Sequence, residues 1–367
     1  MRVLITGAGG FVGKNLSVHL RERKVDFVAF TRDTCEEQLP ALLDGVDFVF
    51  HLAGVNRPEN PGDFAAGNTG LTEQLCAAIA ATGRAIPVLY TSSSQAALDN
   101  HYGVSKRGAE QALLDLERQT GSPVYIYRLP NIFGKWSRPN YNSAVATFCY
   151  NIANDLPIRI NDTAAPVTLV YVDDVVADFM KLMDTRPAGV QWPELVTVYH
   201  ATVGQLADTI TAFKASRDSM ITEPVGTGLT RALYSTYLSF FNPAQFAYTV
   251  PVHADPRGRF VELLKTKDSG QISYFTAHPG ITRGGHYHHS KNEKFLVIQG
   301  QARFAFRHIV TGERHELMTT GSLPEVVETV PGWSHDITNV GTDEMIVMLW
   351  ANEIFDRQNP DTVTYQV

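Results

Sequence analysis

The segment that most constrains the fold lies at the start of the chain, where a short apolar run at residues 3–5 leads directly into the glycine-rich residues 6–13. Gly7, Gly10 and Gly13 stand in the spacing GxxGxxG, which is typical of the first strand-to-helix turn of a dinucleotide-binding βαβ unit. The glycines of such a turn permit a tight bend, close approach of the backbone to a pyrophosphate, and close packing of helix on strand. By itself, the motif also fits a tight turn that binds no ligand.

Short apolar runs alternate with stretches of helical periodicity through the first part of the chain. They lie at residues 27–30, 48–50, 88–90 and 124–127, and this alternation is typical of a parallel sheet. After about Gln245, short apolar runs recur with turns between them and little helix, as in an all-β domain. We therefore predict a Rossmann-type doubly wound α/β domain over residues 1–244 and an all-β domain over residues 245–367.

Composition narrows the class of partner. The 367 residues include 31 basic and 38 acidic side chains, a formal net charge of −7, whereas nucleic acid binds to basic surfaces. The sequence has no apolar run of about 18 residues, and its N-terminus lacks the features of a signal peptide. Its three scattered cysteines make no disulfide pattern. We expect a cytoplasmic protein with no nucleic-acid and no membrane partner.

The segment around the predicted domain boundary, residues 230–249, bears on how the chain associates. A solvated linker is polar, whereas this segment is rich in aromatic residues and so indicates docked domains or a dimer contact. We expect a homodimer. The aromatic residues are Tyr234, Tyr237, Phe240, Phe241 and Phe246.

The end of the second predicted strand bears on the choice of cofactor. An NAD site places an acidic residue there to bind the ribose 2′-hydroxyl, whereas an arginine can pair with a 2′-phosphate. The sequence has Arg32 at this point, which favours NADPH. Two other interpretations stay open: Arg32 is an ordinary exposed loop residue, or the adjacent Asp33 reaches the ribose.

A tyrosine and a lysine stand in the spacing YxxxK. Tyr102 and Lys106 are four residues apart, so both side chains lie on one face of a predicted helix. An ammonium close to a phenol lowers its pKa, and we expect Lys106 to act on Tyr102 in this way so that the phenol can transfer a proton. The hydroxyl-rich residues 91–94 end a predicted strand and point to the same place.

These features, together with residues 51–54, 128–134 and 171–175, resemble the extended short-chain dehydrogenase/reductase family from residue 1 to about 240. The resemblance implies a nucleotide-sugar substrate and catalytic roles for Ser93, Tyr102 and Lys106, with Ser94 open as the alternative to Ser93. Asn131 is either a substrate contact or a structural turn amide. The residues implied to contact the cofactor are Gly7, Gly10, Phe11, Val12, Gly13, Arg32, Leu52, Ala53 and Lys106.

One departure from that family narrows the reaction. Members that dehydrate nucleotide sugars carry an acidic pair just after the catalytic serine or threonine, as acid and base for the loss of water. Residues 94–97 read Ser-Gln-Ala-Ala and contain no carboxylate. Ketone reduction, or epimerisation by oxidation and reduction, is therefore favoured over elimination.

The C-terminal part carries two histidine motifs. Residues 280–300 fit G-x5-HxH-x4-E-x6-G, with His286, His288 and Glu293, and His335 follows in a Pro-Gly-Trp-Ser-His segment. These motifs resemble those of the cupin family, whose jelly-roll barrel brings such side chains together. The resemblance predicts a metal site of these four residues, with zinc favoured over iron, manganese or nickel. A metal-free barrel with hydrogen-bonded histidines is the alternative.

Residues 253–262 and 282–287 also resemble the dTDP-sugar 3,5-epimerases, which are cupins themselves. The resemblance implies that Arg257 and Arg283 bind substrate. It also makes His286 a base that takes a proton beside a keto group, and one lone pair cannot serve both as base and as metal ligand. The tyrosine acid that these enzymes use late in the barrel is replaced by phenylalanine, so inversion at one carbon is expected instead of two.

Over its full length the chain resembles the CapF-type family of bifunctional capsular-polysaccharide enzymes. The resemblance implies that the cupin domain inverts carbon 3 of a UDP-linked 2-acetamido-2,6-dideoxy-4-ketohexose. The first domain then reduces the 4-ketone with NADPH to UDP-2-acetamido-2,6-dideoxy-L-talose, a precursor of UDP-N-acetyl-L-fucosamine. Two alternatives stay open: a reductase whose cupin is a structural or oligomerisation module, and a sensor without enzyme activity.

Overall fold

The computed structural model describes residues 1–358 and 360–367. The chain divides into two compact units, the first made of Met1–Ile210 with Arg231–Phe241 and the second of Thr211–Thr230 with Asn242–Val367. Residues 211–230, which the boundary predicted at residue 244 assigns to the first domain, thus belong to the second unit.

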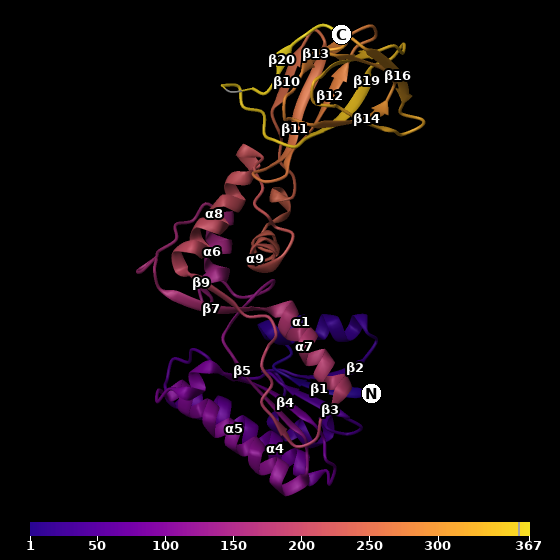
Figure 1. The fold of residues 1–367 in the computed structure, drawn as a ribbon. Coiled ribbons are helices and arrows are strands. Elements are labelled where there is room, and N and C mark those ends of the chain that lie inside the picture. Colours follow the sequence, from indigo (N-terminus) through magenta and orange to yellow (C-terminus); the bar gives the residue numbers. More distant parts are fainter. Residues whose placement is uncertain (359) are drawn as a thin grey trace. The chain divides into compact units, whose positions relative to one another are not determined.

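The first unit is built on a six-stranded parallel sheet with the order β2-β1-β3-β4-β5-β8 (Figure 1). Its short strands are the apolar runs of the sequence, which can be buried on both faces because parallel sheets are covered by helices on both sides. The strands are β1 (Arg2–Thr6), β2 (Asp26–Phe30), β3 (Phe48–His51), β4 (Val88–Ser93), β5 (Val124–Leu129) and β8 (Val190–Gln191).

Helices cover both faces of this sheet. Alternate residues of β1 point to opposite faces: Val3 and Ile5 pack with helices α1 (Phe11–Glu22) and α7 (Val172–Thr185). Leu4 packs on the other side with α4 (Leu71–Ala81) and α5 (His101–Thr120). The predicted Rossmann-type doubly wound fold is confirmed.

The other elements of the chain up to residue 245 are short or lie outside this sheet. β6 (Asn131–Phe133), β7 (Pro166–Tyr171) and β9 (Tyr199–Thr202) form a small sheet of their own. The remaining elements are η1 (Glu36–Gln38), α2 (Leu39–Leu42), α3 (Gly62–Phe64), η2 (Ala65–Gly70), η3 (Ser94–Ala97), α6 (Ala144–Ala153), α8 (Val203–Ser219), α9 (Gly228–Leu238) and η4 (Pro243–Gln245).

The C-terminal residues form two β-sheets that share one core. One sheet has the order β10-β11-β12-β19-β14-β17 and the other β16-β15-β18-β13-β20. The strands are β10 (Val252–Asp255), β11 (Gly258–Thr266), β12 (Gly270–Ala277), β13 (Thr282–Tyr287), β14 (Glu293–Gln299), β15 (Gln301–His308), β16 (Arg314–Thr320), β17 (Val326–Glu328), β18 (Trp333–Asn339), β19 (Met345–Ala351) and β20 (Val363–Thr364).

Alternation along these strands explains the sandwich. In β19, for example, Met345, Val347 and Leu349 are buried while the residues between them are not, because successive side chains point to opposite faces. These residues pack against Phe304 and Ile337 of the other sheet in one cluster. The predicted all-β C-terminal domain is confirmed. None of the helices in the described parts of the chain has the length and apolar composition needed to cross a membrane.

Candidate functional site

The strand order of the first unit creates a crevice at the glycine-rich turn. From β1 the chain passes to β2 on one side and then returns to β3 on the other side of β1. The connections after β1 and β3 therefore leave in opposite directions, and a crevice opens at the carboxyl ends of these two strands. The residues at this edge are those of the glycine-rich turn and of the segment that follows His51.

The glycine-rich turn is packed too tightly to accept side chains at two of its glycines. Gly7 has a φ of +71°, and a Cβ there would lie 2.7 Å from the Ala53 nitrogen. A Cβ on Gly13 would lie 2.3 Å from the Gly7 oxygen. Gly10 precedes α1 as its N-cap, and no side chain caps that helix end. The turn thus brings Leu52 and Ala53 beside the uncapped N-terminus of a twelve-residue helix, which favours an anionic group such as a pyrophosphate.

The contrast between two glycines of this turn gives a test. Gly13→Ala is expected to lower the free energy of unfolding by about 2–3 kcal/mol, because the added methyl group meets backbone atoms that cannot move aside. Gly9→Ala is expected to stay within about 0.5 kcal/mol of the unmodified chain, since nothing lies within 4 Å of a Cβ there. Urea denaturation measures both values.

A titration with NADPH completes this test. Weaker NADPH binding by Gly9→Ala at unchanged stability would place the cofactor in the open space beside Gly9. Equal stability of the two variants would contradict the packing argument.

The structure brings the three predicted catalytic side chains together at the end of β4 and the start of α5. The Ser93 side chain lies beside the Tyr102 phenol, whose hydroxyl donates to Asn56 Oδ1 at 3.2 Å. Lys106 Nζ lies 5.9 Å from the centre of the Tyr102 ring. Lys106 is buried and donates to the Thr91 oxygen at 3.0 Å. A Cβ on Gly54 would lie 3.1 Å from Lys106 Nζ, so this group stands beside the segment that contacts the glycine-rich turn.

The neighbouring serines point elsewhere. Ser92 donates to Glu110 Oε1 at 2.5 Å, and Ser94 is exposed at the start of η3. The buried Glu110 also accepts two hydrogen bonds from Arg128, at 2.9 and 2.7 Å. Glu110 follows Lys106 by one helical turn on the same face of α5. The sequence spacing could therefore have revealed it as a support for this group, and it was missed.

The protonation of Tyr102 and Lys106 differs from the expectation. Burial raises the pKa of Tyr102, and the hydrogen bond with Ser93 only partly opposes this effect. Burial also lowers the pKa of Lys106 to about 8, against the attraction of Glu110. The predicted lowering of the Tyr102 pKa by Lys106 is wrong for this structure, because burial outweighs the opposing effects and the pKa is raised. The phenol is therefore held in its protonated form, as a proton donor requires.

Two buried polar residues that the sequence analysis missed hold the segment between these groups. Asn68, in the π-helical η2, accepts from the Val55 nitrogen at 2.9 Å and donates to the Val55 oxygen at 3.1 Å and to Ser105 Oγ at 2.9 Å. It thereby ties the loop after β3 to α5. Sequence spacing carries no signal for this role, since a lone asparagine in a loop-like stretch is common.

His51 is the other missed residue, and its tautomer follows from its partners. Thr72 donates to the Asn68 oxygen at 2.7 Å, so its hydroxyl accepts from His51 Nε2 at 2.8 Å. Thr6 Oγ1 accepts from the Ala53 nitrogen and donates to His51 Nδ1 at 2.7 Å. Burial and then the charge of Lys106 lower the pKa of His51 to about 3. A neutral imidazole thus links the glycine-rich side of the crevice to Asn68.

Other residues predicted for this site have different surroundings. Arg32 is exposed and forms no hydrogen bond or ion pair with another residue in the described part of the chain. Phe11 and Val12 pack on the apolar core with their side chains, which leaves their backbone at the helix start for a ligand. Asn131 donates to the Thr168 oxygen at 3.1 Å, and a contact of this residue with substrate stays a prediction.

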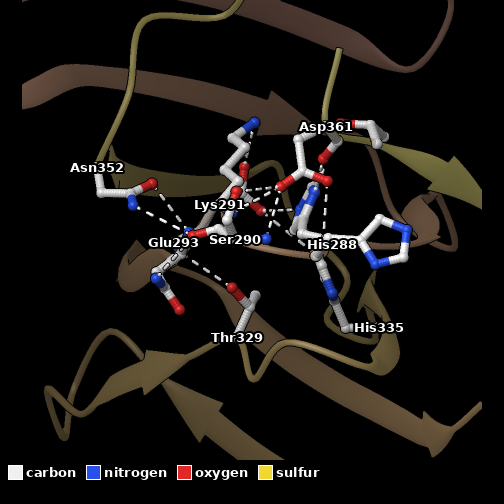
Figure 2. Close-up of polar contacts among 11 residues, drawn as sticks. His288, Ser290, Lys291, Glu293, Thr329, His335, Asn352 and Asp361 are labelled. Atoms are coloured by element: carbon white, nitrogen blue, oxygen red, sulfur yellow. Dashed lines mark hydrogen bonds and ion pairs between the residues drawn. The ribbon is translucent and has the colours of Figure 1, made fainter.

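The four predicted metal ligands converge in the second unit. The ligand atoms of His286, His288, Glu293 and His335 all lie within 4.8 Å of one another. His286 is on β13, Glu293 on β14 and His335 on β18, while His288 follows β13 directly. Figure 2 shows Glu293 facing His288 and His335, with Nε2 to Oε2 distances of 3.2 and 3.4 Å.

The donor set fits a metal cation. His288 Nδ1 donates to the Asp361 oxygen at 2.5 Å, so its Nε2 lone pair faces the Glu293 carboxylate. Neither nitrogen of the buried His335 has a hydrogen-bond partner among the described residues. Lone pairs that face a carboxylate repel it unless a proton or a cation lies between them. Three imidazoles and one carboxylate form a set that suits zinc and other divalent transition metals.

The electrostatics of the cluster keep its donors available. Burial raises the pKa of Glu293, but contacts with His288, His335 and Lys291 outweigh it and leave this pKa well below its usual range. Burial, followed by the charges of His335 and His288, lowers the pKa of His286 to about 4. A carboxylate and a neutral imidazole are therefore both present at pH 7. The buried Lys291 ammonium, 3.0 Å from Glu293 Oε1, is another partner that the sequence analysis missed.

Arg257 and Arg283 lie close to each other but are engaged locally. Arg257 pairs with Asp255 at 2.6 Å. Arg283 donates to the Thr276 oxygen at 3.1 Å and lies 5.1 Å from the centre of the Phe275 ring. The structure records no contact of either arginine with the four metal-ligand side chains in the described residues, so substrate binding by them stays a prediction.

Comparison with known proteins agrees with a two-part chain. Residues 3–194 match the NAD dependent epimerase/dehydratase family, and residues 253–363 match the polysaccharide biosynthesis C-terminal domain. A curated relative, the UDP-2-acetamido-2,6-beta-L-arabino-hexul-4-ose reductase of Pseudomonas aeruginosa strain PA103, is 62% identical over 368 residues, which cover 100% of this chain and 99% of the relative.

Two solved structures of CapF are similar to this chain over its full length. The capsular polysaccharide assembling protein CapF from Staphylococcus aureus is 41% identical, with a TM-score of 0.93 and 100% of both chains covered. CapF with the inhibitor 3-isopropenyl-tropolone is 38% identical, with a TM-score of 0.86 and the same coverage. The UDP-glucose 4-epimerase of Thermotoga maritima is 19% identical, covers 65% of this chain and 98% of its own, and has a TM-score of 0.57. This last similarity shows the fold alone.

Proposed function

The chain belongs to the NAD dependent epimerase/dehydratase family and, over its full length, to the family of the Pseudomonas reductase and the CapF proteins, and from this membership we propose that it reduces a UDP-linked 4-keto sugar with NADPH. The observation that carries the proposal is the grouping of Ser93, Tyr102 and Lys106 beside the glycine-rich turn. The fit of the turn to a pyrophosphate and the protonated phenol beside it both support a reductase.

In the proposed reaction the glycine-rich turn would hold NADPH, which would supply the hydride for carbon 4. Tyr102 donates its phenolic proton to the ketone oxygen, which becomes the hydroxyl of the product. Ser93 hydrogen bonds the same oxygen and orients it. Lys106 holds the cofactor ribose, with Arg32 as the proposed partner of a 2′-phosphate.

We propose epimerisation at carbon 3 as the second activity, with the C-terminal cluster as its site. A divalent metal, for which we propose zinc, held by His286, His288, Glu293 and His335 supplies Lewis-acid polarisation of a ketone oxygen. With His286 as a ligand, the base that takes the carbon-3 proton is another group. Epimerisation precedes reduction, since the 4-ketone acidifies this proton and is lost on reduction. The proposed product is UDP-2-acetamido-2,6-dideoxy-L-talose.

A proton NMR time course in D2O tests both activities in one tube. The UDP-2-acetamido-2,6-dideoxy-4-ketohexose is first incubated with the protein alone and NADPH is added later. The proposal expects deuterium at carbon 3 before NADPH, and loss of the 4-ketone only after it. Reduction without prior deuterium incorporation would show instead that the protein is a reductase whose C-terminal domain is structural. Absence of both reactions would favour a protein that binds these ligands without turnover.

A cytoplasmic location and a homodimeric state stay predictions from the sequence.

The lowered pKa of Lys106 predicts a pH dependence. Its ammonium is charged below about pH 8 and neutral above it, whereas the raised pKa of Tyr102 keeps the phenol protonated over this range. We expect kcat/KM for reduction, which reports groups of the free enzyme, to fall as the pH rises through about 8. Initial rates of NADPH oxidation measure this profile. A profile that stays level to about pH 10 would contradict the role of the ammonium.

A further inference from the structure

We propose that the C-terminal residues 361–365, here called the C-terminal clasp, support the metal centre: they hold His288 in its ligating tautomer and hold the turn that directly follows it. This inference rests on the proposed metal-binding function of the second unit. The clasp lies about seventy positions after His288 in the chain, and no motif of the sequence connects the two.

The first contact of the clasp is with the imidazole of a proposed ligand. The Asp361 main-chain oxygen is 2.5 Å from His288 Nδ1, and a carbonyl oxygen can only accept. The proton of the neutral imidazole is therefore on Nδ1, and the lone pair on Nε2 is directed at the cluster (Figure 2). A partner on the far nitrogen of a ligating histidine fixes its tautomer and ring orientation and raises its basicity.

The second contact is with the turn between His288 and Glu293. The Asp361 carboxylate accepts from the backbone nitrogens of His289, Ser290 and Lys291 at 2.9, 2.7 and 2.8 Å, and from Ser290 Oγ at 2.9 Å. Figure 2 shows Asp361 over this turn. One carboxylate thus holds three consecutive peptide groups directly after His288.

The remaining residues of the clasp reach the other two histidines. β20 pairs with β13, with Thr364 opposite His286 and Val363 opposite Tyr287. The Tyr365 nitrogen donates to the Gly285 oxygen at 2.9 Å. The Tyr365 oxygen accepts from Ser334 Oγ at 2.5 Å, and Ser334 precedes His335. The clasp therefore contacts a ligand or an immediate neighbour of a ligand for each of the three histidines.

Glu293 is held from the opposite side, which separates its position from the clasp. Its nitrogen donates to Thr329 Oγ1 and its oxygen accepts from the Thr329 nitrogen, both at 2.9 Å. Asn352 holds the end of the turn through the Asn292 nitrogen at 2.9 Å. Loss of the clasp is therefore expected to disturb the three histidines while Glu293 stays in place. The metal site would be weakened without collapse of the sandwich.

The test compares Asp361→Ala and a chain that ends at residue 360 with the unmodified chain. Affinity for Zn²⁺ is measured by competition with a chromogenic chelator, and Co²⁺ is bound as a spectroscopic probe of the ligand geometry. We expect Asp361→Ala to bind Zn²⁺ about 10–100-fold more weakly, with an altered visible spectrum of bound Co²⁺. The shortened chain, which also loses the acceptor of His288 Nδ1, is expected to bind still more weakly.

Asp268→Ala is the matched control, because it removes an exposed carboxylate from the turn between β11 and β12. It is expected to leave the affinity and the spectrum unchanged. Far-ultraviolet circular dichroism and NADPH-dependent reduction report whether each variant keeps its fold. If a variant is unfolded, Ser290→Ala, which removes a single hydrogen bond to Asp361, is expected to show a smaller loss of Zn²⁺ affinity.

The outcomes separate the clasp from the function on which it rests. Equal Zn²⁺ affinities of the folded Asp361→Ala variant, the shortened chain and the unmodified chain would overturn the clasp and leave the metal site intact. Failure of the unmodified chain to bind Zn²⁺ or Co²⁺ would overturn the metal site and the clasp with it. Unchanged Co²⁺ spectra in all folded variants would show that residues 361–365 do not orient the ligands.

Discussion

Tyr102→Phe is expected to lower kcat for NADPH-dependent reduction by about 10²–10⁴-fold, the usual contribution of a positioned general acid. The phenol is the proton donor that stands beside Ser93 and Lys106, and its raised pKa keeps the proton in place until the alkoxide forms. The change removes one oxygen atom, so the ring still packs against Phe64. Stopped-flow measurement of NADPH oxidation checks the expected loss of kcat. A fluorescence titration measures the NADPH affinity of the variant.

Tyr125→Phe is the control for the removal of a phenol. Tyr125 lies on β5 and donates to the Pro187 oxygen at 2.8 Å. Loss of this hydroxyl is expected to lower the free energy of unfolding by about 1 kcal/mol and to leave the activity unchanged.

Tyr102→Phe is also expected to keep deuterium exchange at carbon 3, because that reaction is assigned to the other unit. A Tyr102→Phe enzyme that reduces the ketone at the normal rate would refute the proposed role of the phenol.

His335→Ala is expected to show the opposite pattern. It removes one of the four proposed metal ligands, and loss of the polarising cation should lower the rate of carbon-3 exchange by about 10²–10³-fold. Metal content by mass spectrometry should fall in parallel. For the reduction assay, the substrate is first equilibrated with the unmodified protein without NADPH and is then separated from that protein by filtration. The His335→Ala variant should still reduce this substrate with NADPH.

The control for this second variant is His289→Ala. His289 is exposed next to the ligand His288, and its ring contacts Tyr287 instead of the cluster. It should bind metal and exchange the carbon-3 proton as the unmodified chain does. Exchange that survives both His335→Ala and removal of the metal by a chelator would show that the cluster is not the epimerase site.

Much of the fold could be predicted from the sequence because its signals are local. The apolar runs identified β1 to β5 of the parallel sheet and the all-β character of the C-terminal part, and the GxxGxxG turn located the first strand and helix. The allocation of residues 211–230 was not predictable in this way, since α8 is an ordinary helix and only its packing decides the unit to which each part belongs.

The candidate sites, too, could be predicted from the sequence only where local spacing brings the residues together. Helical spacing placed Tyr102 and Lys106 together, and the HxH pattern placed His286 and His288 in one cluster. For the two serines that the sequence left open, only the tertiary structure shows that Ser93 is buried beside Tyr102 while Ser94 is exposed. Local spacing could not reveal the degree of burial that raises the pKa of Tyr102.

The sequence by itself determined the alternation of strands and helices in the first unit, the glycine-rich turn and the types of side chain available for chemistry, because these depend on neighbours within a few positions. Only the tertiary structure decided which polar groups meet across long distances in the chain, such as Asp361 with His288 and His51 with Thr6 and Thr72. The physical reason is that a buried polar group takes whichever partner the packed fold brings within hydrogen-bonding distance, and sequence separation does not limit that choice.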